Sequence, residues 1–151
     1  MQGVNWLTRK VLNIGTITMT IKQVVNDQGV TLLTIDSKSG AGLPGSTENR
    51  ILNNETRSKK HPIFGNVAGR TRWAELNDLP SPWLAEGWET GTTRLVLMTT
   101  EHVDIEAVTY QAGGIALVDN ERRYVRHVEV QKGEEKLKAR IVYDYLGPLD
   151  A

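Results

Sequence analysis

The sequence contains no cysteine among its 151 residues, which excludes disulfide bonds, thiolate nucleophiles and cysteine-ligated metals. Neither sign of charge is in excess, since 18 basic residues balance 18 acidic ones, and we therefore expect no nucleic-acid or anionic-membrane partner. No apolar run approaches the roughly 20 residues of a membrane-spanning helix, and the first ten residues do not resemble a secretory signal. These absences predict a soluble, cytoplasmic protein.

The chain length predicts one domain, residues 1–151, built around a single core. Short alternating segments separated by turn residues favour an all-β fold. We expect a closed, antiparallel up-and-down β-barrel of about nine strands, with a sandwich as the alternative. Ser81-Pro82 indicates the start of a short helix that caps the barrel, and another short helix is expected near 6–12. The expected strands are about 16–22, 30–37, 47–52, 63–73, 93–100, 105–111, 115–118, 122–131 and 136–146.

The two strands nearest the C-terminus alternate most clearly, and one of them places a charged residue on its apolar face. In the first of them, Arg126 shares its side with Tyr124, Val128 and Val130, which is the side that period two turns toward a core. An unpaired guanidinium is costly to bury, so Arg126 needs a partner, water or a ligand. Two explanations stay open: an inward carboxylate, Glu48 or Glu106, neutralises it, or it holds a ligand oxygen.

The remaining motifs point to no cofactor and no metal. Residues 40–45 fit G-x-G-x-x-G, but a proline interrupts them and no helix follows, so we interpret them as a hairpin loop. The histidines His61, His102 and His127 are scattered and lack metal-ligand spacing. His127 falls on the polar side of its strand, where we expect it to be solvated.

Four tryptophans and four tyrosines stand against a single phenylalanine. Rings with a polar atom suit a partly polar pocket, although ordinary core packing accounts for some of them. Trp73 shares its parity with Val67 and Thr71 and is expected to face inward. Tyr110 lies on a strand whose two sides are too alike to assign.

Five segments occur in this order: Trp6–Lys10, Gly45–Arg50, Phe64–Trp73, Gly87-Trp88 and Glu121–Arg126. Together they resemble a family of small lipocalin-like proteins of filamentous fungi, most of which have no assigned function. The resemblance covers nearly the whole chain and implies a calycin-type barrel that encloses an apolar molecule. One departure from the family pattern is that Gly113-Gly114-Ile115 replaces a Trp-Gly-Phe element, which we interpret as room for a bulky ligand.

Two functional hypotheses follow from this resemblance, because fold alone does not settle function. The first is a cofactor-independent cyclase, pericyclase or isomerase of fungal secondary metabolism, which holds a polyketide- or terpenoid-like intermediate and polarises a carbonyl. The second is a non-catalytic carrier of fatty acids or similar lipids; a structural or protein-binding barrel is a third possibility. The expected catalytic residues are Tyr124 and Arg126, and the expected ligand-binding residues are Met19, Thr71, Trp73, Tyr110, Gly113, Leu137, Ile141 and Tyr143.

Overall fold

The computed structural model describes residues 17–39, 45–61 and 65–147. The expected helix near 6–12 and most of the G-x-G-x-x-G segment lie outside the described residues. Within them, nine strands and three short 3-10 helices are present, and all strand pairs are antiparallel. An all-β, antiparallel fold is therefore confirmed. No helix of the described part is long and apolar enough to span a membrane.

The strands form two sheets rather than the expected closed barrel. A three-stranded sheet has the order β1-β2-β3, and a six-stranded sheet has the order β4-β5-β6-β7-β8-β9. Among the described residues no strand pairing joins the two sheets. The strands are β1 (Ile17–Val25), β2 (Thr31–Ser39), β3 (Ser46–Ile51), β4 (Arg57–His61), β5 (Gly65–Glu75), β6 (Arg94–His102), β7 (Ala107–Val118), β8 (Glu121–Lys132) and β9 (Glu135–Val142).

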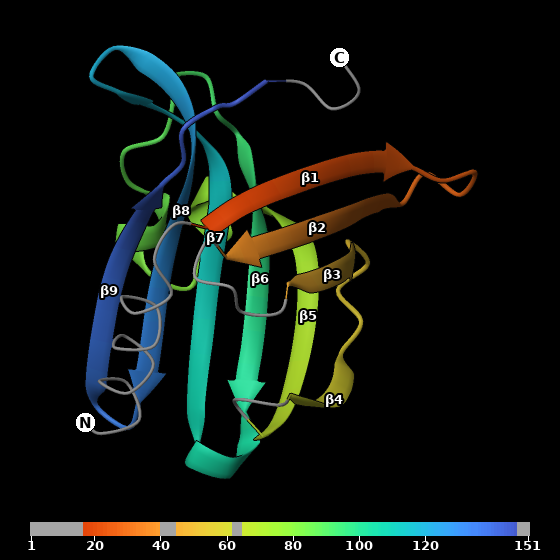
Figure 1. Cartoon of the computed structure of the whole chain (residues 1–151). Helices are drawn as coiled ribbons and strands as arrows, with labels where there is room; N and C mark the ends of the chain where they lie inside the picture. Colours follow the sequence, from red (N-terminus) through yellow and green to blue (C-terminus); the bar gives the residue numbers. More distant parts are fainter. Residues whose placement is uncertain (1–16, 40–44, 62–64, 148–151) are drawn as a thin grey trace.

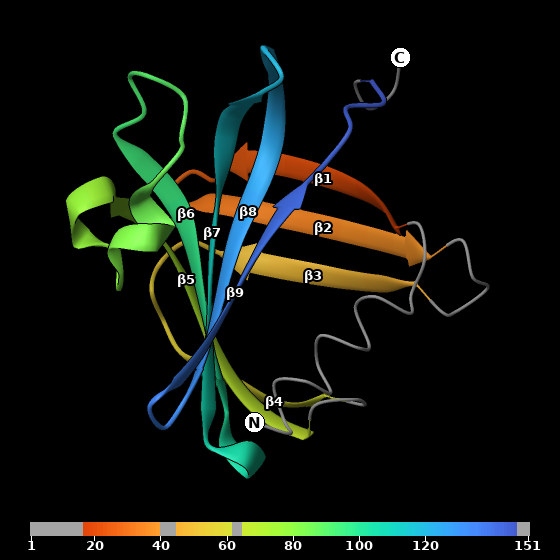
Figure 2. The same cartoon turned by 90° about the vertical axis from the view of Figure 1, so that its left-hand side faces the viewer.

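The three-stranded sheet crosses one face of the six-stranded sheet, as both views show (Figure 1, Figure 2). We call this the inner face. The core between the sheets contains Ile35 of β2 and Met98 of β6, each 1% exposed, and Met19, Ile21 and Trp73 pack against this core. The alternation of β1 and β2 explains the arrangement, because one parity of each strand is apolar.

The opposite, outer face of the six-stranded sheet is covered by the segment between β5 and β6 (Figure 2). It contains the 3-10 helices η1 (Leu76–Asp78) and η2 (Pro82–Ala85). Leu84 of η2 is fully buried against Leu95 and Ala112. The expected helix thus begins after Ser81, but it is a single 3-10 turn that packs on the sheet and caps no barrel. A third 3-10 helix, η3 (Val103–Ile105), joins β6 to β7.

Candidate functional site

Arg126 lies on the inner face of β8 and is only 7% exposed. Alternation sets its direction, because β8 places the same parity, including Val130, against the core. Across the sheet, Arg126 pairs with Gly113 of β7 on one side and with Ile141 of β9 on the other. Neither neighbour offers a charge, so the guanidinium depends on polar groups that reach it from further away.

Two of the three guanidinium nitrogens have hydrogen-bond partners. Nε donates to the Tyr124 hydroxyl at 3.0 Å, and Nη1 donates to Oε1 of Gln111 at 3.2 Å. The third nitrogen, Nη2, is buried and has no partner among the described residues. A buried donor without a partner is rare in folded proteins, and a guanidinium binds oxygen acceptors in a fixed fork geometry. Arg126 therefore retains donor capacity for an oxygen of a bound molecule.

A second tyrosine completes the polar group around Arg126. The rings of Tyr124 and Tyr143 are 5.3 Å apart between centroids, and the Tyr143 amide donates to the Tyr124 carbonyl at 3.0 Å. Burial raises the pKa of the Tyr143 hydroxyl, and the charge of Arg126 only partly opposes this effect. Tyr143 therefore stays a neutral phenol near pH 7, able to donate a hydrogen bond.

No carboxylate among the described residues forms an ion pair with Arg126. Glu48 pairs instead with Arg50, at 3.3 Å. Glu106 is exposed on the turn after η3, with a backbone φ of 53°. Burial disfavours the charged form of Arg126, but Tyr124, Tyr143 and the more remote Glu48 together raise its pKa. Arg126 thus remains charged without a direct counter-ion among the described residues, so neither Glu48 nor Glu106 neutralises it through an ion pair.

The residues that were expected to bind the ligand lie in separate regions of the molecule. Met19 and Trp73 pack against the core between the sheets, and the Trp73 indole donates to the Thr31 hydroxyl at 3.3 Å. Thr71 is 2% exposed on the same inner face of β5. Leu137 and Ile141 are partly buried on the inner parity of β9. All of them except Met19, which comes from β1 of the three-stranded sheet, lie on the face that carries Arg126, and among them only Ile141 is its direct neighbour.

Tyr110 and Gly113 differ from their expected settings. Tyr110 lies on the outer face, where it packs against the cluster formed by Leu84, Leu95 and Ala112; the sheet therefore separates it from Arg126. Gly113 is on the inner face, but the space beside it is filled. A β-carbon there would stand 2.6 Å from the Tyr124 hydroxyl.

His127 was expected to be solvated, and this expectation is wrong. Its side chain is 4% exposed and lies between the rings of Trp83 and Trp88, each 4.6 Å away between centroids. Nδ1 is 3.2 Å from the Trp83 carbonyl oxygen, which can only accept, so Nδ1 carries the proton. Burial lowers the pKa of His127. His127 is buried because the segment after β5 packs over this face of β8, although the sequence of the face is largely polar.

Glu129 lies two residues further along the same outer face and is completely buried. Within the described part of the chain, neither carboxylate oxygen has a hydrogen-bond partner, and Nε2 of His127 also lacks one. Among the described residues, no group of three or more His, Cys, Asp or Glu side chains lies close enough to hold a metal ion.

Sequence reasoning missed one residue of the Arg126 group and most of the outer cluster. Gln111 was detectable in principle, because it is a polar residue two positions before Gly113 and therefore on the same face. Trp83 and Trp88 gave no such signal, because residues outside regular strands have no parity that assigns them to a face.

Comparison with known proteins gives two relatives over almost the full chain. Pericyclase pydY of Acremonium sp is 37% identical over 151 residues, which cover 98% of this chain and 82% of that protein. Probable pericyclase scpY of Mollisia scopiformis is 36% identical over 154 residues, which cover 99% of this chain and 81% of that protein. No family model matches the chain, and no solved structure matches it.

Proposed function

This chain belongs to the same family as these two fungal pericyclases, and from that premise we propose that it is a cofactor-independent pericyclase of secondary metabolism. Its substrate would be a bulky, apolar polyketide- or terpenoid-like intermediate held against the inner face. The fold would be a variant of the lipocalin-like barrel, in which the three-stranded sheet packs across the six-stranded one without closing the ring of hydrogen bonds.

The observation that supports this function best is the buried Arg126 with its unpartnered Nη2. In a pericyclic reaction the bonds form and break together in one cyclic transition state, and no atom is gained or lost. A protein can accelerate such a step by holding the reactive conformer. It can also place hydrogen-bond donors on a carbonyl oxygen whose negative charge grows in the transition state.

Arg126 and its three polar neighbours would then fill three distinct roles. Arg126 would donate from Nη2 to the carbonyl oxygen of the substrate. Tyr124 and Gln111 accept from its other nitrogens and would hold the guanidinium plane in place. Tyr143 would add a phenolic donor beside Tyr124. Because Tyr124 and Gln111 already orient the guanidinium, it would need little rearrangement during the reaction.

A direct test uses a synthetic linear triene that carries an unsaturated ketone, incubated with the purified protein. A pericyclase should form a cyclised product of unchanged mass and single handedness, faster than in buffer, and Arg126→Leu should lose this acceleration. A carrier would bind the triene but release it unchanged. Binding without conversion, across a panel of such trienes, would reject the proposed activity.

A further inference from the structure

A second charged group faces the inner side of the molecule from β3. Glu48 pairs across the sheet with Ile35, which is 1% exposed and part of the core. Residues opposite each other in an antiparallel pair point to the same face. Glu48 therefore projects from the three-stranded sheet toward the six-stranded sheet, which carries Arg126.

Arg50 holds Glu48 in this direction. Its Nη2 is 3.3 Å from Glu48 Oε2, and its Nη1 lies 3.9 Å from the point where a β-carbon on Gly69 would stand. Arg50 thus reaches from β3 to the inner face of β5. Its side chain is 19% exposed, whereas that of Glu48 is 37% exposed. The carboxylate is anchored on one side and accessible on the other.

Glu48 and Arg126 interact electrostatically without a direct contact. The carboxylate is one of the groups that raise the pKa of Arg126, and it also acts on Tyr143. Yet the two side chains form no ion pair, so their charged atoms are more than 4.0 Å apart. The six-stranded sheet therefore presents hydrogen-bond donors from β8 and from Tyr143, just after β9, and the three-stranded sheet presents an acceptor from β3.

We propose that Glu48 accepts a hydrogen bond from the substrate at a second point, distinct from the carbonyl bound by Arg126. This inference rests on the proposed function and narrows its substrate class. The substrate would be an apolar molecule with a carbonyl oxygen near Arg126 and a hydroxyl or amide N–H group near Glu48. An ionised carboxylate accepts strong hydrogen bonds and cannot donate one, so an ether oxygen at that place would be rejected.

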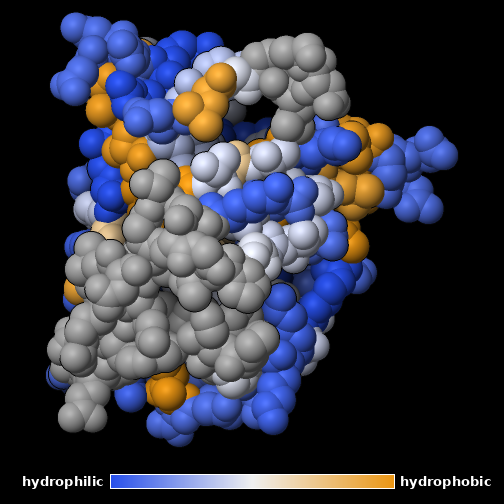
Figure 3. Space-filling model, viewed as in Figure 1, coloured by the Kyte–Doolittle hydropathy of each residue, from blue (hydrophilic) through white to orange (hydrophobic). Residues whose placement is uncertain are grey.

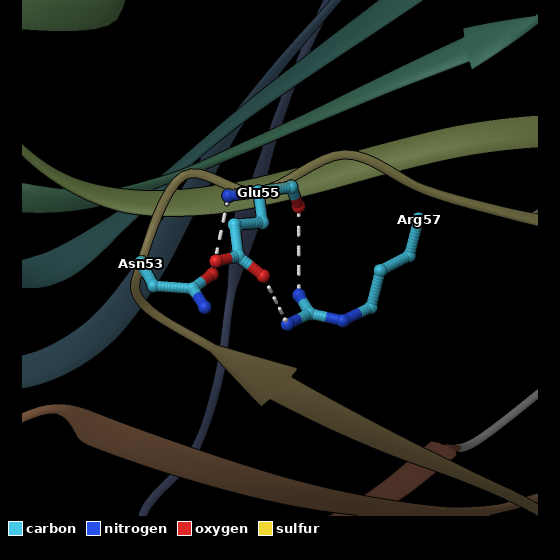
Figure 4. Close-up of polar contacts among 3 residues, drawn as sticks. All are labelled: Asn53, Glu55 and Arg57. Atoms are coloured by element: carbon cyan, nitrogen blue, oxygen red, sulfur yellow. Dashed lines mark hydrogen bonds and ion pairs between the residues drawn. The ribbon is translucent and has the colours of Figure 1, made fainter.

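The test compares two synthetic probes and four proteins. The probes are a linear trienone with a free hydroxyl group at the end remote from the ketone, and its O-methyl ether. The proteins are the wild type, Glu48→Gln, Glu55→Gln and Arg126→Leu. Glu55 provides the matched control because it forms the same Glu-x-Arg pair, with Arg57 at 3.4 Å, but on an exposed segment (Figure 4).

Binding of both probes is measured by calorimetry, and turnover by chiral chromatography. We expect the wild type and Glu55→Gln to prefer the hydroxy probe by roughly 10- to 100-fold, the value of one hydrogen bond to a charged group. Glu48→Gln should lose this preference, because an amide can donate to the ether oxygen. Should Glu48→Gln fail to fold, as judged by circular dichroism, Glu48→Thr replaces it.

Two results would overturn the role of Glu48. Equal or absent binding of both probes by the wild type would do so, and so would a preference that survives in Glu48→Gln. Conversion of the probes by Arg126→Leu tests the role of Arg126 separately. If Arg126→Leu stops conversion while Glu48→Gln keeps the wild-type preference, the activity stands and the second contact fails. If Arg126→Leu converts both probes at the wild-type rate, the role of Arg126 fails, and if the wild type binds the probes but converts neither, the proposed function itself fails.

Discussion

The hydroxyl of Tyr124 occupies the space beside Gly113, 2.6 Å from where a β-carbon on that residue would stand. The same hydroxyl accepts the hydrogen bond from Nε of Arg126. Gly113 therefore permits the approach that orients the guanidinium. Its lack of a side chain serves the protein's own tyrosine, and the sequence-based interpretation of this glycine as room for a ligand does not describe the structure.

Gly113→Ala should therefore impair the site while leaving the strand intact. The new methyl group must displace the Tyr124 ring, which costs roughly 1–3 kcal/mol for overpacking and breaks the contact with Arg126. We expect the melting temperature to fall by roughly 3–10 °C and turnover of the trienone to fall with it. Differential scanning calorimetry and product chromatography measure the two effects.

A double-mutant cycle identifies the cause. Tyr124→Phe removes the oxygen that the methyl group would meet, so Gly113→Ala should cost less stability in that background than in the wild type. Additive losses would mean that the two residues do not compete for the same space.

The same glycines explain why the strand assignment from sequence was only partly right. Residues 105–111 and 115–118 were expected as two strands separated at Gly113-Gly114, but β7 is continuous through both. A β-carbon on Gly114 would collide with a methyl group of Leu95. Sequence patterns treat paired glycines as a break, whereas here close packing on both faces requires them.

The strand count was nevertheless nine, because a second error offset the first. β4 was not predicted, since its sequence Arg-Ser-Lys-Lys-His has no apolar parity. It is one edge strand of the six-stranded sheet, and charged side chains are typical of such edges.

Exposed apolar residues lie at an edge of the three-stranded sheet, on β1, where Val24 and Val25 are 49% and 62% exposed (Figure 3).

Arg126→Leu is the most direct test of the site. Loss of a preorganised donor to a developing negative charge lowers turnover by roughly 100- to 1000-fold, and that is the expected effect. The fold should survive, because removing a buried charge that lacks a counter-ion is often neutral or stabilising. Circular dichroism and single-turnover kinetics follow the two properties.

Two further substitutions serve as controls for Arg126→Leu. Arg122→Leu removes an exposed cation from the same strand, one that is paired with Glu89, and should leave turnover unchanged. Arg126→Lys keeps the charge but loses the planar fork, so it should restore only part of the rate. Full activity of Arg126→Leu would place the chemistry elsewhere.

The sequence predicted which alternate residues of β8 point toward the core, but it did not predict that the residues on the other side of the strand are buried. Tyr124, Arg126 and Val130 face the core as the alternation indicated. His127 and Glu129 looked like a solvated edge. His127 is buried because the rings of Trp83 and Trp88 stack on it. These rings come from a segment without strand periodicity, so only the tertiary structure brings them over β8.

His127 should make the fold sensitive to mild acid. Burial lowers its pKa in the folded protein, whereas a histidine in the unfolded chain titrates near pH 6.5. Below that pH the unfolded state binds more protons, so the contribution of His127 to stability is complete above pH 6.5 and is lost as the pH falls through the lowered folded-state pKa. Melting temperatures at pH 7.5, 6.5 and 5.5 should record this decline.

His127→Asn removes the titrating ring but can still donate to the Trp83 carbonyl. We expect its melting temperature to vary less over this pH interval than that of the wild type. An identical slope in the two proteins would assign the acid sensitivity to other groups.

Glu129 offers the clearest stabilising substitution. Both of its carboxylate oxygens are buried without a hydrogen bond to any described residue, so the folded state bears a desolvation cost that no hydrogen bond from these residues offsets. Glu129→Met keeps a similar volume and removes that cost, and we expect unfolding in urea to require roughly 1–4 kcal/mol more. Glu129→Gln should gain less, because the amide is still polar and unpartnered.

Glu101→Met, at an exposed position of β6, controls for added hydrophobicity and should change stability by less than about 0.5 kcal/mol. If Glu129→Met instead destabilises the protein by about 2 kcal/mol or more, the carboxylate has a partner such as buried water, which can satisfy interior polar groups of this kind.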